Sequence, residues 1–180
     1  MNRSLSVLVL AISLMSGSWL VAATEEVDYM AILMDGKKIG HAVHIRRVEA
    51  SRVTTIDEMN LLIGRGPSAI QFTGTETSVE NTSGKPVAFE IVQTISGMEQ
   101  KRKGTINSGK VRMTIQNGPS TEQKVIAYPR GALMAEGLRL LQMKMGLEPG
   151  LKYETLMFRP DMDEALPAQV EVGKKTKVDL

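Results

Sequence analysis

ALMAEGLRLLQMKM, residues 132–145, is the stretch that decides the fold, because it is the one clearly amphipathic helical pattern in a chain otherwise rich in strand patterns. Its apolar residues recur at a period close to 3.6 and so share one helix face. These residues are Met134, Leu138, Leu141 and Met145. Gly137 borders the face and lets a neighbouring sheet approach closely. We therefore predict a helix over 132–145 that packs on a sheet through these five residues. We expect the residues to form either an apolar contact with the sheet or one wall of an apolar pocket between helix and sheet.

The chain before this helix reads as strands separated by tight turns. We expect eight of them, over residues 27–34, 39–48, 52–63, 69–80, 87–95, 99–106, 111–116 and 121–127. Asp35-Gly36 between the first two is a strong hairpin signal, since such turns require positive φ angles. Parallel strands would need crossover helices between them, and the sequence offers none. The order therefore predicts an antiparallel meander.

The chain after the helix carries fewer signals. Gly146 and Pro149 end the helix, and residues 153–158 resemble a strand. We expect a loop over 160–167 and a last hairpin formed by residues 168–172 and 176–180, broken off within its second strand. The predicted fold is thus mainly β: a curved antiparallel meander sheet, half-barrel or sandwich, packed on one helix.

Residues 1–23 have the pattern of a signal peptide. A basic residue, Arg3, precedes an apolar run that ends in small residues at Ala22 and Ala23. Cleavage near Ala23 would leave residues 24–180 as a single β-rich domain, truncated at its carboxyl end. An uncleaved membrane anchor is the alternative. In both cases the remainder lies outside the cytoplasm, in the periplasm or in the extracellular medium.

Composition and charge exclude several classes of function. The formal net charge is +2 and falls to +1 without Arg3, which gives no electrostatic basis for nucleic-acid binding. Basic residues cluster in 100–103 and 173–177, but aromatic residues are not interleaved with them, so we interpret them as turn-flanking charges. The chain has no cysteine, which excludes disulfides, thiolate metal sites and a cysteine nucleophile in this sequence.

No pattern of residues specifies a catalytic, cofactor-binding or metal site, and we predict none of the three. His41 and His44 are three apart on one expected strand, so they point to opposite faces and cannot share a metal. The Gly-rich residues 64–67 lack the ending and the helix of a phosphate loop. The acidic loop over 160–167 lacks the fixed positions of an EF-hand. Ser, His and Asp side chains could also form the active site of a hydrolase, but the sequence has no G-x-S-x-G elbow to support this.

Several features together resemble the amino-terminal β-rich region of secreted bacterial transglutaminase-like proteins, which precedes their papain-like catalytic core. They are Tyr29 at the start of the first strand, the hairpin residues Gly36, Ile39, Gly40 and His41, the alternating Thr73, Thr75 and Thr77, the turn Gly84-Lys85-Pro86, and residues 147–150 followed by Phe158. Members of this family carry a Cys-His-Asp triad in the later domain. The resemblance therefore implies a non-catalytic module whose partner is a downstream catalytic domain or another envelope protein.

Two functional hypotheses follow. In the first, an exported accessory domain without enzymatic activity positions a transglutaminase- or peptidase-like domain, or binds its protein or cell-wall substrate. In the second, a periplasmic carrier of lipid or lipoprotein holds its cargo in an apolar cavity between sheet and helix. Twelve methionines make the second worth testing, since flexible thioether side chains can line a cavity for acyl chains. The simpler interpretation is that methionine fills a core that has few aromatic residues.

Overall fold

The computed structural model describes residues 23–64 and 69–177. Within these ranges the chain forms ten strands and one helix, in the order β1 (Thr24–Met34), β2 (Lys37–Glu49), β3 (Arg52–Ile63), β4 (Ile70–Asn81), β5 (Pro86–Ile95), β6 (Met98–Asn107), β7 (Lys110–Asn117), β8 (Ser120–Ala127), α1 (Ala135–Met145), β9 (Lys152–Arg159) and β10 (Glu164–Glu171). Three parts of the chain lie outside the described residues: 1–22 of the expected leader, 65–68, which include residues 65–67 of the Gly-rich stretch, and 178–180 of the expected last strand.

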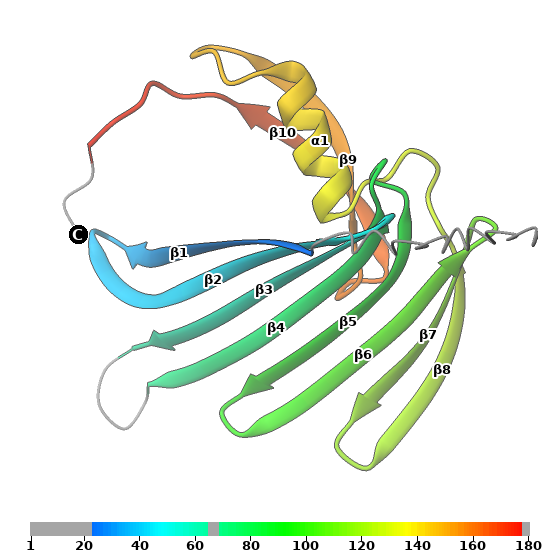
Figure 1. The fold of residues 1–180 in the computed structure, drawn as a ribbon. Helices are drawn as coiled ribbons and strands as arrows, with labels where there is room; N and C mark the ends of the chain where they lie inside the picture. Colours follow the sequence, from blue (N-terminus) through cyan, green and yellow to red (C-terminus); the bar gives the residue numbers. More distant parts are fainter. Residues whose placement is uncertain (1–22, 65–68, 178–180) are drawn as a thin grey trace, which may run out of the picture.

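The first eight strands form one antiparallel sheet in chain order. Each strand pairs with its neighbour in sequence, and β1 and β8 are the two edges of an open, curved sheet (Figure 1). Asp35 and Gly36, which join β1 to β2, have φ angles of 50° and 72°, as a two-residue hairpin turn requires. The predicted fold class, a curved antiparallel meander with a helix on it, is confirmed.

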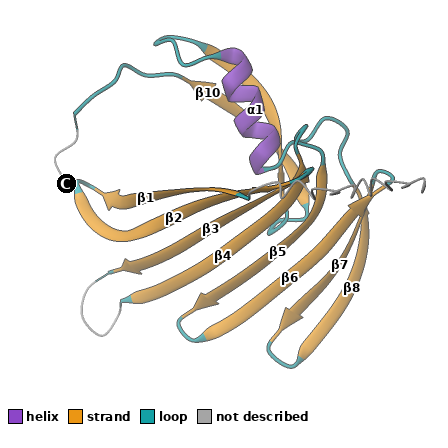
Figure 2. Cartoon of the chain, in the orientation of Figure 1, coloured by secondary structure: helices purple, strands orange, loops and turns teal. Residues whose placement is uncertain are grey.

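One face of the sheet is covered at one end only. The helix α1 and the β9–β10 hairpin lie over this face near the start of β1, and the strands extend well past them (Figure 2). The helix contacts β3 and β4. The far ends of the strands, with the β1–β2 and β5–β6 turns, lie away from both elements.

The core lies between the sheet and the chain that enters and follows the helix. Its fully buried members are Phe89, Val111, Met113, Ile115, Ala132, Met134 and Phe158. Phe158 on β9 meets Phe89 edge-to-face at a centroid distance of 6.1 Å and Tyr128 at 5.0 Å. Ala132 and Met134 belong to the lead-in of the helix. The β9 strand and this lead-in, more than the helix itself, therefore fill the space over β5–β7.

The predicted start of the helix at residue 132 is wrong. Leu133 instead pairs with β9: its N–H donates to the Leu156 carbonyl at 2.8 Å, and its carbonyl accepts from the Phe158 N–H at 2.9 Å. Met134 is extended, and the helix begins after it. The amphipathic pattern reports only the spacing of apolar side chains, so it could not predict that the backbone pairs with a distant strand.

The predicted last hairpin is also wrong. Asp163, with a φ of 59°, closes a turn directly after β9, so that β10 begins at Glu164, inside the expected loop over 160–167. The strand then pairs back along β9 as a two-stranded sheet. Proline argues against a central strand, but β10 lies at an edge of its two-stranded sheet and so tolerates Pro167. Residues 173–177 form no strand.

Candidate functional site

The five helix residues singled out by the sequence lie in different surroundings. Met134 is 3% exposed and belongs to the core, and Gly137 is buried against the β4–β5 turn. Leu138 and Leu141 are half-buried, whereas Met145, at the end of the helix, is 39% exposed. Only Met134 and Leu138 of the five line the main cavity of the described residues.

The helix approaches the sheet most closely at two glycines. A methyl group added to Gly84 would lie 2.7 Å from the Gly137 Cα, and one added to Gly137 would lie 3.1 Å from the Gly84 carbonyl oxygen. Gly84 also has a φ of 76°, a conformation that favours glycine. The β4–β5 turn and the first turn of α1 therefore meet backbone to backbone.

A buried carboxylate fixes this first turn. Glu80 on β4 is 1% exposed, and its two oxygens accept hydrogen bonds from the N–H groups of Glu136 and Gly137 at 2.5 and 3.0 Å. No side chain of the helix itself provides a cap. Glu80 therefore satisfies the free N–H groups of the helix from another strand, next to the positive end of the helix dipole. Burial raises the pKa of Glu80, and the two backbone hydrogen bonds oppose that rise.

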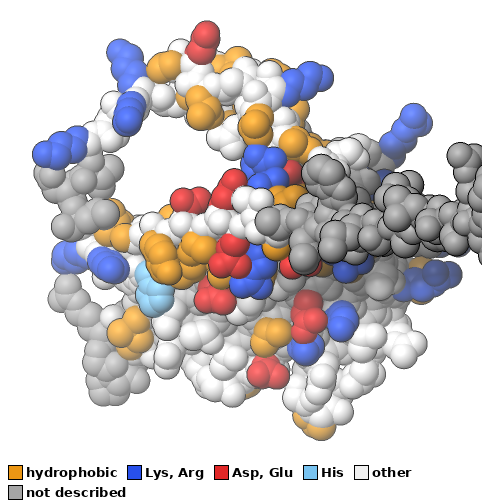
Figure 3. Space-filling model, in the orientation of Figure 1, with side chains coloured by type: hydrophobic (Ala, Val, Ile, Leu, Met, Phe, Trp, Pro, Cys, Tyr) orange, Lys and Arg blue, Asp and Glu red, His pale blue; other side chains and the backbone are white. Residues whose placement is uncertain are grey.

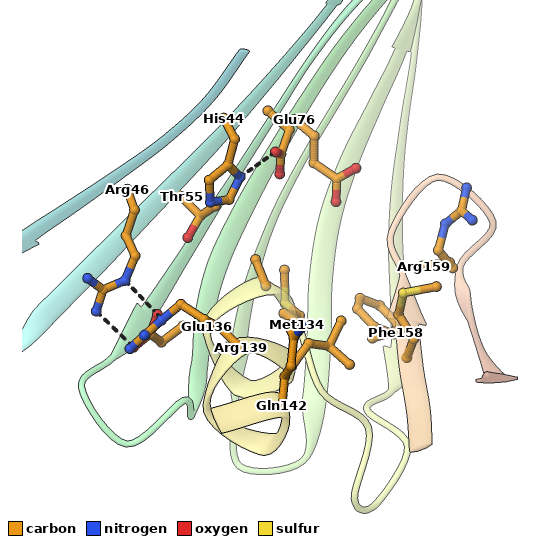
Figure 4. Close-up of a pocket in the computed structure, with 14 residues that line it drawn as sticks. His44, Arg46, Thr55, Glu76, Met134, Glu136, Arg139, Gln142, Phe158 and Arg159 are labelled. Carbon is orange, nitrogen blue, oxygen red and sulfur yellow. Dashed lines mark hydrogen bonds and ion pairs between the residues drawn. The ribbon is translucent and has the colours of Figure 1, made fainter. Parts of the chain in front are cut away.

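A second buried carboxylate, Glu136, is held by two arginines. Arg46 on β2 donates to it at 2.9 and 3.1 Å, and Arg139, one turn along the helix, donates at 2.8 Å to each oxygen. Figure 4 shows both guanidinium groups directed at the carboxylate. Burial opposes ionisation, but these hydrogen bonds and charges outweigh it and lower the pKa of Glu136 to about 2. The cluster ties β2 to α1 and leaves no net negative charge there.

Next to this cluster lies a cavity of about 490 Å³ between the sheet, the helix and β9 (Figure 4). Three sheet strands and both covering elements contribute to its wall. The lining residues are His44, Arg46, Thr55, Asp57, Glu76, Met134, Ala135, Glu136, Leu138, Arg139, Gln142, Met157, Phe158 and Arg159. Its size falls in the range of small-molecule sites, and its wall combines an apolar side with several charged groups.

The sheet side of the cavity carries two carboxyl groups. Asp57 on β3 pairs with His44 on β2, with 2.7 Å between Asp57 Oδ1 and His44 Nδ1. Glu76 on β4 lies opposite Asp57 in the sheet and is half-buried. Burial, followed by the charges of Asp161 and Asp57, raises the pKa of Glu76, and the charge of Arg159 acts in the other direction.

The β9 side supplies one arginine. Arg159 donates from Nε and Nη2 to the carboxylate of Asp161 at 2.9 and 2.6 Å. This pair uses two of the three nitrogens of the guanidinium group. The remaining nitrogen, Nη1, makes no hydrogen bond to any of the described residues.

The two histidines lie on opposite faces of β2, as the period of a strand predicts. His44 lines the cavity under the helix, and His41 lines a shallow pocket on the other face of the sheet. Within residues 23–64 and 69–177, no group of three or more His, Asp or Glu side chains is arranged to hold a metal ion. In the same ranges no helix is long and apolar enough to cross a membrane.

The sequence did not reveal the charged cluster. Arg46 and Glu136 are separated by 90 residues, and only the packing of the helix on the sheet brings them together. Glu136 and Arg139 lie off the apolar face of the predicted helix, yet Glu136 is 2% exposed. The one available signal was an acidic residue in the first helical turn, but such residues are common on solvated helices.

The far end of the cavity-facing side of the sheet carries exposed apolar side chains, which we call the distal strip. Side chains alternate along a strand, so Met59 and Ile63 share the face of Asp57, and the register extends this face to neighbouring strands. The strip consists of Met30, Met59, Ile63, Ile70, Ile95 and Met98, each 37–72% exposed. Figure 3 shows hydrophobic side chains over β1 and β2 at this end, below an opening bordered by the segment that follows β10.

Comparison with protein-family models, curated proteins and solved structures finds no match for the chain.

Proposed function

We propose that this chain is an exported accessory module of the bacterial envelope, without enzymatic activity of its own, that docks a transglutaminase- or peptidase-like catalytic domain on its distal strip. The resemblance described above provides the class of partner. The distal strip is the single observation that carries the proposal, because soluble proteins rarely leave a contiguous apolar surface across several strands uncovered.

The register makes the strip continuous. Ile63 pairs with Ile70, and Ile95 pairs with Met98, so these four side chains form two adjacent pairs on one face. The half-buried Leu61 and Phe72, paired with each other between them, close the gap. Met59 and Met30 continue the apolar surface to the edge strand through Ala42. Methionine and isoleucine side chains can adapt to the surface of a partner domain, with methionine the more flexible of the two.

Site-specific photo-crosslinking in the native envelope tests this proposal. A photoreactive residue in place of Met98, which is 72% exposed in the strip, should cross-link to peptides of a papain-like domain. Val125 is a matched control, since it is 60% exposed on β8 and faces the other side of the sheet. Identical products from both positions would contradict the proposal, as would products from Met98 that contain no such domain. The reading frame after the Leu180 codon tells whether that domain belongs to the same polypeptide.

The lipid-carrier hypothesis is favoured by a different observation. A second, small pocket is lined by Met59, Phe72 and Ile91 and also by Asp57 and Glu76 of the main cavity, so it lies between that cavity and the strip. An acyl chain would fit the strip but not the charged wall next to it, where desolvation of carboxylates costs free energy. Native mass spectrometry of protein purified from membranes decides this point: a stoichiometric co-purifying lipid would favour the carrier over the docking module.

A further inference from the structure

The main cavity holds polar groups whose bonding capacity the protein does not use. Within the described residues, the Glu76 carboxylate makes no hydrogen bond or ion pair, although it is half-buried. The Nη1 group of Arg159 is likewise unused, because Asp161 occupies only Nε and Nη2. The side chain of Gln142 is exposed at the helix side of the same cavity and also has no partner among these residues. A carboxylate and a guanidinium nitrogen without protein partners in one cavity are available to a polar ligand.

The unused groups carry charges of opposite sign and lie on two walls of the cavity, one formed by the sheet and one by β9. On the sheet wall, Glu76 and Asp57 are both carboxylates, and their only basic neighbour within hydrogen-bonding distance is His44. On the β9 wall, Arg159 presents the free edge of a guanidinium group. Arg46 and Arg139 do not add to that positive charge, since they share Glu136 and Arg46 also pairs with Glu26. A complementary ligand therefore carries a cationic group toward β3 and β4 and an anionic group toward β9.

The rest of the cavity wall determines the part of the ligand that connects its cationic and anionic groups. The half-buried Leu138 and Met157 form the apolar side of the cavity, backed by the core residues Met134 and Phe158. This side would receive an aliphatic or aromatic body. The volume of about 490 Å³ accommodates a ligand of more than one amino acid but excludes a folded chain.

We propose that the cavity between β2–β4, α1 and β9 binds a short zwitterionic peptide, with its free ammonium group at Glu76, its carboxylate at Arg159 Nη1 and an apolar side chain against Leu138 and Met157. The ammonium group gives Glu76 the hydrogen-bond donor that the protein lacks. The carboxylate of the ligand accepts a hydrogen bond from Arg159 Nη1, because the planar edge of a guanidinium group matches the geometry of a carboxylate. This cavity is separate from the distal strip, so the inference does not depend on the docking proposal.

Calorimetric titration with three forms of one dipeptide tests the assignment. The probes are Leu-Phe, its N-acetylated form, which lacks the ammonium group, and its carboxyl amide, which lacks the carboxylate. We expect Leu-Phe to bind and each blocked form to bind about tenfold or more weakly, as the loss of one charge-assisted hydrogen bond implies. Absence of Leu-Phe binding at millimolar concentration would overturn the proposal, and so would equal binding of all three forms.

Two variants assign the two ends of the ligand. Glu76→Gln should bind free and acetylated Leu-Phe with similar affinity, while it keeps the preference against the amide. Arg159→Gln should show the opposite pattern. Glu58→Gln makes the same carboxyl-to-amide change on the other face of the sheet and should bind as the unmodified protein does. If Glu76→Gln still bound the acetylated form more weakly than free Leu-Phe, the assignment of the ammonium group to Glu76 would be wrong. This test does not depend on whether Arg159→Gln folds.

A variant of the distal strip separates the two proposals. Met98→Gln should abolish docking and leave Leu-Phe affinity unchanged, because Met98 does not line the cavity. Preferential binding of laurate over Leu-Phe, with competition between them, would instead identify an acyl-chain site and overturn the peptide assignment.

Discussion

Glu80 on β4 accepts a hydrogen bond of 2.5 Å from the backbone N–H of Glu136. The buried Glu80 carboxylate therefore positions Glu136, whose own carboxylate is also buried. The helix begins at this point, on top of the sheet, without a cap of its own. We therefore expect Glu80→Ala to reduce the free energy of unfolding by roughly 3 kcal/mol, since it removes two hydrogen bonds to a charged acceptor and leaves two buried N–H groups unsatisfied. Urea unfolding measures this. Glu122→Ala, at an exposed carboxylate of β8, is the control, and an equal effect of both would contradict the role of Glu80.

The Glu136 carboxylate should make the protein sensitive to acid. Its pKa of about 2 in the folded protein lies below the ordinary value of 4.5, so its stabilising contribution is present above pH 4.5 and is lost as the pH falls toward 2. The difference corresponds to about 3 kcal/mol. We expect Glu136→Gln to be less stable at pH 7 by about this amount, because Arg46 and Arg139 lose their partner. The stability difference from the unmodified protein should shrink toward pH 2; a constant difference would refute this explanation.

Glu76 should show the opposite pH dependence. Its pKa is raised by burial and by the charges of Asp161 and Asp57, with Arg159 opposing. A raised pKa stabilises the folded protein below pH 4.5, and that contribution is lost as the pH rises through the value in the folded state. Glu76→Gln should therefore gain stability relative to the unmodified protein between pH 4 and pH 7, in the absence of ligand. Urea unfolding at both values tests this, with Glu58→Gln expected to show no such trend.

Gly84 should tolerate no side chain. Gly84→Ala imposes a positive φ on alanine and places its methyl group against the Gly137 Cα. Gly109 has a similar φ of 70° but open space around it, so Gly109→Ala carries the conformational cost alone, about 1–2 kcal/mol. We expect Gly84→Ala to cost about 1–3 kcal/mol more, the usual range for overpacking. Thermal unfolding compares the two, and equal losses would show that the helix can move away from the turn.

Asp163 should hold the β9–β10 hairpin on the sheet. It accepts hydrogen bonds from Arg102 on β6 at 2.7 Å and from Lys124 on β8 at 2.8 Å, and it is 15% exposed. Asparagine also tolerates the φ of 59° at this position, so Asp163→Asn removes the charge without new backbone strain. We expect a loss of about 1.5 kcal/mol and faster hydrogen exchange in β9. Glu171→Gln, in an exposed pair with Lys152, should change stability by less than about 0.5 kcal/mol.

Local patterns predicted the sheet well because each of its strands pairs with the next one in the chain. Turn residues such as Asp35-Gly36 and the alternation of side chains were sufficient for that part. The prediction was wrong where a pairing was not local: Leu133 joins β9 across 24 positions, and this pairing delays the start of the helix. The candidate site was missed for the same reason, since Glu76, Arg159 and Gln142 meet only after the helix and β9 have folded over the sheet.

The order of the strands also determines how the molecule folds. Each hairpin from β1 to β8 closes between segments that are adjacent in the chain, so the sheet can form progressively, with a low entropy cost for each closure. The helix is different: it reaches Glu80 and Arg46 only across long separations, which places its docking late. We therefore expect the transition state for folding to contain the central hairpins. The Glu80 and Glu136 contacts would then govern the rate of unfolding, and so the lifetime of the folded protein.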